Sequence, residues 1–363
     1  MSLDSLSPAQ QRIRSGWILS PLGDLAIFTG PILMALCLIG WAASNGTLDR
    51  DVPPWMFALL VIACDVAHVY ATAFRVYLDP GRFRERPGLY VGIPIACFVA
   101  GVLAYGFSAA FFWRVLAYLA VWHFVRQQWG WVAYTRAKGG EGLAGRRLDQ
   151  LTIYAVTGYP LVYWHTHLPR DFAWFIEGDF ASLPGWIHLV AATLHWGILA
   201  AFAATQTRSG LQGSGVNWAK IQVVVTTWIA WYGGIVYLNS DVAFTALNVL
   251  SHGVPYLAVV WSVERAQVGE RRPPLSRFFE PRLAWLLLSL LILVGYLEEW
   301  MWDALVWQEH ATLFLSVTND ALPTVLLGFV VPLLATPQAT HYVLDGWLWK
   351  RRAHRDLMGW MET

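Results

Sequence analysis

The chain has 363 residues, of which 56% are hydrophobic and only 13% are charged. Because soluble domains carry about one quarter charged residues, this composition excludes an ordinary soluble domain and indicates a membrane protein. Lysine and arginine (25) nearly balance aspartate and glutamate (24), and no basic run is interleaved with aromatic residues. We therefore expect no nucleic-acid partner.

Ten apolar runs are long enough to cross a bilayer, which takes about 20 residues in a helix. They lie near residues 22–45, 54–77, 88–107, 109–134, 148–166, 184–205, 217–238, 242–264, 282–302 and 320–349. The runs predict an all-α fold, a polytopic integral membrane helix bundle of about ten transmembrane helices. A single transmembrane domain would then cover residues 1–363, with short tails at 1–20 and 350–363.

Basic residues mark every second loop between these runs. Arg82, Arg84 and Arg86 lie in one such loop and Arg146 and Arg147 in another, whereas the intervening loops carry mainly aspartate and glutamate. Lysine and arginine accumulate on the cytoplasmic side of membrane proteins. The alternation predicts an even number of spans and two cytoplasmic termini.

Polar residues within the runs form four groups with helical spacing. A charged group deep in lipid costs roughly 3 to 10 kcal/mol, so such residues are candidates for function. Steps of three and four residues place each group on one helical face. The groups are Asp65, His68, Thr72 and Arg75; His123, Arg126 and Gln127; Thr245, Asn248 and His252; and Gln338, His341 and Asp345.

The four groups also share one depth in the membrane. They lie on the second, fourth, eighth and tenth runs, which all point from the outer to the inner side. Each histidine precedes the next basic flanking residue by 7 to 13 positions, or roughly 10 to 20 Å at about 1.5 Å per residue. A common depth predicts that the four groups surround a single site.

Imidazole and carboxylate are ligands of non-haem iron and also suit manganese or zinc. Two aspartates and four histidines match the ligand count of a dinuclear site in a carboxylate-bridged bundle, so we expect two iron ions. The predicted ligands are Asp65, His68, His123, His252, His341 and Asp345. The groups predicted to orient them are Arg126, Gln127, Asn248 and Gln338.

An iron site in the inner half of a bilayer suits an oxygenase, hydroxylase or desaturase. Its substrate would be a lipid-soluble small molecule, and a cytosolic protein would donate the electrons. His195 has apolar neighbours on its helical face, which is typical of a structural histidine.

Three alternatives remain open from the sequence. The polar groups also fit a metal-free network in which an aspartate pairs with Arg126. Two histidines at one depth fit a b-type haem, and Asp/His pairs fit the proton relay of a transporter. In a transporter, Gly253 and Pro255 would break the eighth helix and Pro332 and Pro337 the tenth.

Overall fold

The structure, a computed structural model, describes residues 16–266, 276–314 and 322–349. Within these ranges every regular element is a helix. The predicted C-terminal tail and most of the predicted N-terminal tail lie outside the described residues.

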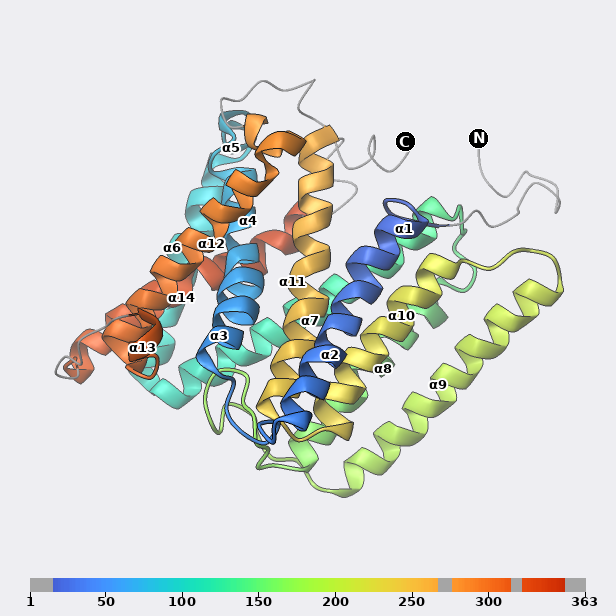
Figure 1. Ribbon diagram of the computed structural model, residues 1–363, viewed down its shortest axis with the longest axis horizontal. Coiled ribbons are helices and arrows are strands. Elements are labelled where there is room, and N and C mark those ends of the chain that lie inside the picture. Colours follow the sequence, from blue (N-terminus) through green and yellow to red (C-terminus); the bar gives the residue numbers. More distant parts are fainter. Residues whose placement is uncertain (1–15, 267–275, 315–321, 350–363) are drawn as a thin grey trace.

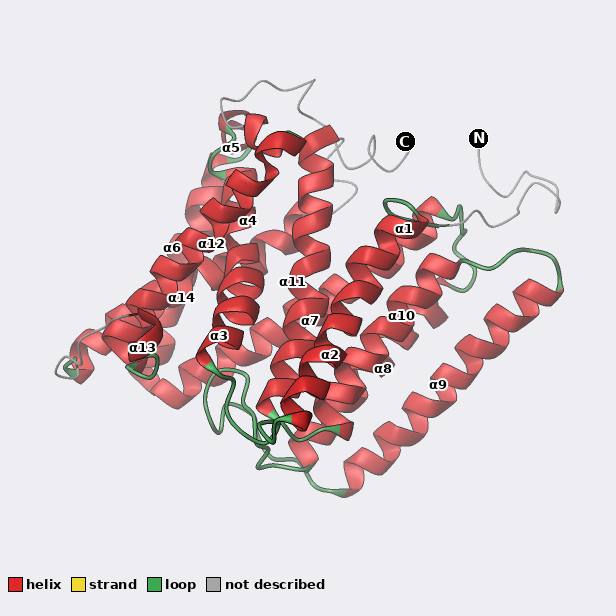
Figure 2. Cartoon of the chain, viewed as in Figure 1, coloured by secondary structure: helices red, strands yellow, loops and turns green. Residues whose placement is uncertain are grey.

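The helices follow the predicted runs closely (Figures 1 and 2). Three of the long helical segments, those beginning at Pro21, Pro54 and Pro87, have proline in the first turn, where its missing N–H leaves no donor unpaired. The first half of the chain contains α1 (Pro21–Asp24), η3 (Leu25–Thr29), α2 (Gly30–Ser44), α3 (Pro54–Phe57), η4 (Ala58–Val66), α4 (Ala67–Val76), α5 (Pro80–Glu85), α6 (Pro87–Phe107), α7 (Ala109–Lys138) and α8 (Arg146–Thr166). The second half contains α9 (Trp186–Leu211), α10 (Trp218–Trp231), η5 (Tyr232–Tyr237), α11 (Asp241–Ala266), η6 (Ser276–Phe279), η7 (Pro281–Leu283), α12 (Ala284–Trp302), η8 (Asp303–Trp307), α13 (Ala311–Phe314) and α14 (Thr324–Leu348).

Seven of these helical segments are long and apolar enough to cross a membrane, which indicates a multi-pass membrane protein. They are Pro21–Ser44, Pro54–Val76, Pro87–Phe107, Trp186–Leu211, Asp241–Ala266, Pro281–Trp307 and Thr324–Leu348. The other predicted runs, which correspond to α7, α8 and α10 with η5, are helical but are not among these seven segments. The prediction of about ten spans therefore stays a prediction.

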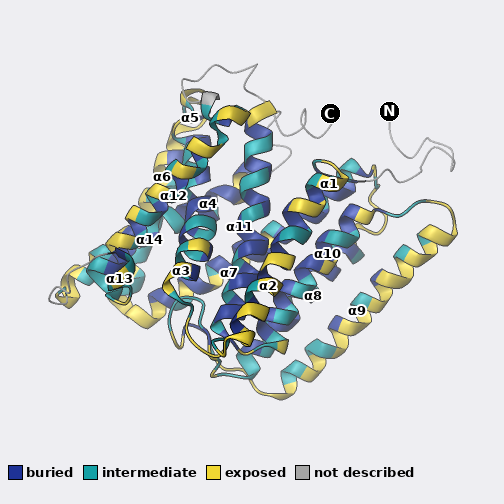
Figure 3. Ribbon diagram, in the orientation of Figure 1, coloured by how far each residue is buried: buried dark blue, intermediate teal, exposed yellow. Residues whose placement is uncertain are grey.

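Helix α11 lies at the centre of the bundle, and α9 lies at its edge (Figure 1). In α11, 72% of the most apolar window is buried inside the protein, against 11% in α9 and 6% in α6. Figure 3 shows the same contrast along α9, where exposed residues dominate. Large side chains such as Leu103 and Leu194 are more than half exposed, so these faces need an apolar surrounding such as lipid.

Small residues allow η4 to pack closely between α11 and α12. A Cβ atom on Gly253 would lie 2.5 Å from the carbonyl oxygen of Cys64, and one on Gly295 would lie 3.2 Å from that of Ile62. Close approach at glycine is typical of membrane helices. The expected break near Gly253 is wrong, because α11 continues through Pro255 to Ala266. Likewise α14 continues through its two prolines, as neighbouring helices in a membrane permit.

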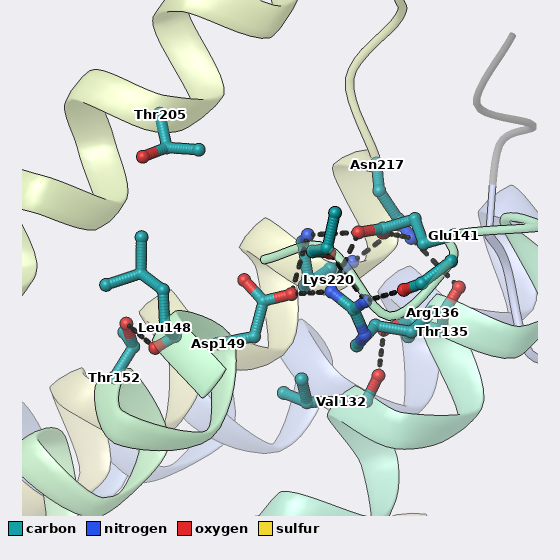
Figure 4. Close-up of polar contacts among 12 residues, drawn as sticks. Val132, Thr135, Arg136, Glu141, Leu148, Asp149, Thr152, Thr205, Asn217 and Lys220 are labelled. Atoms are coloured by element: carbon teal, nitrogen blue, oxygen red, sulfur yellow. Dashed lines mark hydrogen bonds and ion pairs between the residues drawn. The ribbon is translucent and has the colours of Figure 1, made fainter. Parts of the chain in front are cut away.

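A buried ion-pair network joins α7, α8 and α10 at one end of the bundle (Figure 4). The Arg136 guanidinium pairs with the carboxylates of Asp149 and Glu141, and Lys220 Nζ lies 3.1 Å from Asp149 and 2.7 Å from Glu141. Asn217 donates from Nδ2 to Glu141 over 2.7 Å. Part of the basic pattern that predicts the cytoplasmic side therefore also holds helices together.

Candidate metal centre

Four buried histidines from four helices meet in the interior of the bundle. His68 comes from α4, His123 from α7, His252 from α11 and His341 from α14. One ring nitrogen from each lies within 4.8 Å of those of the other three. Their exposed fractions are between 0% and 5%, so water does not surround the group. The common depth of the four histidines in the sequence thus corresponds to a common place in the fold.

The ring geometry directs nitrogen atoms toward a shared centre. His252 Nε2 lies 3.1 Å from His68 Nε2, and the Nε2 atoms of His123 and His341 are buried without a hydrogen-bond partner. Neighbouring rings stand edge to face, with centroids 4.6 to 5.1 Å apart. Buried polar atoms in proteins are nearly always satisfied, so the unpaired nitrogens require a partner.

The spacing of the four nitrogens suits one metal ion. Nitrogens bound at about 2.1 Å stand roughly 3.4 Å apart in a tetrahedron, and about 4.2 Å apart when they lie opposite each other. The observed upper limit of 4.8 Å is about 0.6 Å above the second value and about 1.4 Å above the first. One ion could therefore be bound after small movements of the rings.

Three hydrogen-bonded side chains, Thr72, Tyr256 and Asp345, lie beside Nδ1 of His341. Thr72 Oγ1 lies 2.8 Å from His341 Nδ1 and 2.8 Å from the hydroxyl of Tyr256. That hydroxyl donates to Asp345 Oδ1 over 2.8 Å. Asp345 Oδ1 is itself 3.8 Å from His341 Nδ1. These side chains fix the ring of His341 with Nδ1 turned away from the centre, as groups around metal-binding histidines commonly do.

The two aspartates lie behind the histidine rings. Asp65 Oδ1 is 3.6 Å from His68 Nδ1, and Asp345 is in the corresponding position beside His341. The group of converging donor atoms consists of the four imidazole nitrogens and does not include either carboxylate. The structure thus brings all six predicted ligands together, with the aspartates as neighbours of the rings.

The four residues predicted to orient the ligands differ in position. Gln127 Nε2 donates to the carbonyl oxygen of His252 over 2.9 Å. Asn248 and Gln338 lie on the side toward the acidic loops, where both line a cavity. Arg126 is exposed, donates to the Tyr154 hydroxyl over 3.0 Å and covers the Trp122 ring, so it faces away from the histidines. The expected pairing of Arg126 with a buried aspartate is therefore not present.

Two residues outside the predicted set complete the surroundings of the histidines. Phe124 stacks on the His252 ring at 3.5 Å between centroids and 6° between planes. Tyr342 packs on His123 at 4.8 Å. Each directly follows one of the histidines in the sequence, a position that helical spacing alone does not assign to the site. Tyr256, four residues after His252, is close to a predicted ligand by helical spacing, and its hydroxyl does lie beside Thr72 and Asp345.

His195 differs from the four clustered histidines because both its nitrogens have partners. Its Nδ1 lies 2.8 Å from the carbonyl oxygen of Ala155, and Trp228 Nε1 donates to its Nε2 over 3.2 Å. These contacts are those of a structural histidine, as the sequence predicts.

A cavity of about 860 Å³ adjoins the centre on the side of the acidic loops. Phe124, Tyr342 and Asp65 all line it, and these are the residues that contact or neighbour the histidine rings. A small molecule in the cavity would therefore lie next to the centre.

Comparison of the chain with protein-family models, with curated proteins and with solved structures finds no match.

Proposed function

We propose that the chain is a membrane-bound non-haem iron oxygenase, of hydroxylase or desaturase type, that acts on a lipid-soluble substrate. In this proposal about ten helical segments span the bilayer and both termini are cytoplasmic. The observation that carries it is the convergence of four buried imidazoles beside a cavity. Iron held by imidazole supplies redox and dioxygen chemistry, and no thiolate lies in the group to favour copper(I) or an iron–sulfur cluster.

One ion agrees better with the geometry than the two expected from the sequence. Four neutral imidazoles leave the charge of a divalent ion uncompensated. Asp65 and Asp345 lie directly behind two of the rings and supply two negative charges. A second ion would add two positive charges without further donors in the group of converging atoms. A single ion with outer carboxylates is therefore the electrically balanced arrangement.

The residues around the histidines have separate roles in this proposal. Thr72 and Asp345 hold the ring of His341, and Phe124 keeps water from the face of His252. The connected hydroxyls of Thr72 and Tyr256 can pass a proton between Asp345 and the ring nitrogen. This series of hydrogen bonds runs toward the basic end of the bundle, where electrons from a cytosolic protein would also enter.

Exposed arginines at the basic end suit an acidic electron donor. Several basic residues there are already paired within the protein, since Arg75 and Arg82 both contact Glu264. Among the described residues, the exposed basic side chains at this end include Arg84, Arg86, Arg146 and Arg147. A donor protein would dock on these exposed charges.

The arrangement does not favour the haem alternative. Axial histidines leave the four equatorial positions of the iron to the pyrrole nitrogens of the macrocycle. Here the third and fourth imidazoles lie within 4.8 Å of the first two and fill that space. A haem would require two of the histidines to leave the centre.

The test uses untagged protein purified in mild detergent and reduced without oxygen. About one iron per chain, with a high-spin EPR signal after addition of nitric oxide, would support an iron site with an open position. His252→Ala should abolish the signal, whereas His195→Ala should keep it. A strong Soret band would support haem. Zinc in full occupancy, or no metal, would contradict the oxygenase.

A further inference from the structure

The ionisable side chains that line the cavity beside the histidines are mostly acidic. Eight aspartate and glutamate side chains line it, whereas no lysine or arginine stands among the described residues of its wall. The loops that form its mouth gather at one end of the bundle, between α2 and α3 and between α8 and α9 (Figure 2). Low-dielectric walls strengthen the field of such charges, so the cavity attracts cations and repels anions.

Carboxylates continue from the mouth to the floor. Asp171 and Glu177 are exposed on the loop after α8, at the mouth. Asp65 and Glu299 are only partly exposed and lie deeper in the lining of the cavity. Asp65 also neighbours His68, so the row of carboxyl groups reaches the metal centre.

Aromatic rings form much of the wall between the two ends. Trp113, Trp302 and Trp307 pack against one another with centroids 5.2 to 5.8 Å apart, and Phe175 lies 5.7 Å from Trp113. Indole faces attract organic cations and also bury apolar groups. A small hydrated metal ion would gain little from this wall. Charge and wall together favour a cation that carries an apolar body.

The floor also contains an unused hydrogen-bond acceptor. Asn248 lines the cavity and is 3% exposed. Its Nδ2 donates to the carbonyl oxygen of Phe244 over 3.0 Å, but its Oδ1 is buried without a partner. An acceptor of this kind indicates a ligand with an N–H or O–H group.

We propose that this cavity binds an organic ammonium ion, with its nitrogen near Asp65 and Asn248 and its apolar body against the tryptophans. The proposal rests on the proposed function where it makes this ammonium compound the substrate class of the metal centre. The binding itself requires only the cavity. Entry is from the acidic end, through the loops.

The experiment compares three probes with one apolar body. 4-Phenylbutylamine, 4-phenylbutan-1-ol and 4-phenylbutyrate are titrated by saturation-transfer NMR into protein in nanodiscs of zwitterionic phosphatidylcholine, with empty nanodiscs as the blank. The amine should bind about tenfold more tightly than the alcohol, and the carboxylate should bind least. Equal affinity for amine and alcohol would overturn the proposal. Displacement of the amine by Mg²⁺ at submillimolar concentration would also overturn it, in favour of a metal-ion site.

Variants test the assignment of the floor and the wall. Asp65→Asn should weaken binding of the amine several-fold. Trp307→Leu should also weaken it several-fold, and this variant is used if Asp65→Asn fails to fold. Asp49→Asn is the matched control, because Asp49 is an exposed carboxylate near the same loops but does not line the cavity. An equal loss in Asp49→Asn would show a general charge effect and contradict the site.

A metal-free sample separates this proposal from the proposed function. The titration is repeated after a chelator has removed bound metal. If the purified protein holds no iron and both samples bind the amine selectively, the ammonium site in the cavity is supported and the oxygenase is rejected. Full iron content without selectivity for the amine would support the oxygenase and reject the ammonium site.

Discussion

Thr72 offers the sharpest test of how the centre is held. Its Oγ1 contacts His341 Nδ1 at 2.8 Å, the Tyr256 hydroxyl at 2.8 Å and Asp345 Oδ1 at 3.3 Å. Thr72→Val keeps the shape of the side chain and removes all three contacts. Loss of a group that orients a metal-binding histidine weakens metal affinity by about 10- to 100-fold. That range corresponds to about 1.4 to 2.7 kcal/mol in binding free energy.

The assay is a competition titration of metal-free protein against a zinc indicator, because zinc avoids oxidation during the measurement. Thr72→Ser keeps the hydroxyl and should bind within a few-fold of the unchanged protein. Thr152→Val is the matched control: Thr152 is fully buried, and its Oγ1 donates only to the Leu148 carbonyl oxygen of its own helix. Unchanged affinity in Thr72→Val, or equal losses in Thr72→Val and Thr152→Val, would refute the reasoning.

Two further predictions concern the packing of the helices. Asp149→Asn leaves the buried cations of its network without a full charge partner and should lower the free energy of unfolding by about 3 to 5 kcal/mol. The free energy of unfolding is measured by denaturation in mixed micelles. The control is Glu280→Gln, which removes an ion pair at the surface and should change the free energy of unfolding by less than about 1 kcal/mol. Gly253→Ala places a Cβ 2.5 Å from the Cys64 carbonyl oxygen and should cost about 1 to 3 kcal/mol. Gly130→Ala, which meets no atom within 4 Å, should cost nothing, and a similar loss in both glycine variants would contradict the close-packing argument.

Helical spacing and depth were sufficient to group the histidines. His68 and His341 are 273 positions apart in the sequence, yet both precede a basic flank by a similar distance along helices of the same direction. Burial then follows, because polar groups in a membrane bundle face its interior. The ten helical runs were predictable for a related reason, since each is a long apolar segment between polar loops.

The chemistry of individual side chains was less predictable. Asp345 lies one turn from His341, and that spacing places it near the ring without showing which ring nitrogen it meets. Arg126 is three residues from His123 but turns outward to Tyr154, because its long side chain reaches a partner on α8. The spacing of residues along one helix does not show where the neighbouring helices lie.

The cavity could not be predicted from the sequence at all. Its wall combines the loop after α8, the start of α11 and segment η8, which are far apart in the chain. The aromatic residues there match the pattern of membrane-interface anchors equally well. Only the fold shows that Trp113, Trp302 and Trp307 form one surface.

The central claim is that four imidazoles hold one metal ion, and X-ray absorption at the edge of the bound metal tests it most directly. A centre of this kind predicts about one metal per chain, with a nitrogen shell at about 2.1 Å and the multiple scattering of about four imidazoles. Loss of that pattern in His341→Ala and its retention in His195→Ala would agree. A metal–metal distance of about 3.5 to 4 Å, a sulfur ligand or the absence of stoichiometric metal would contradict the account.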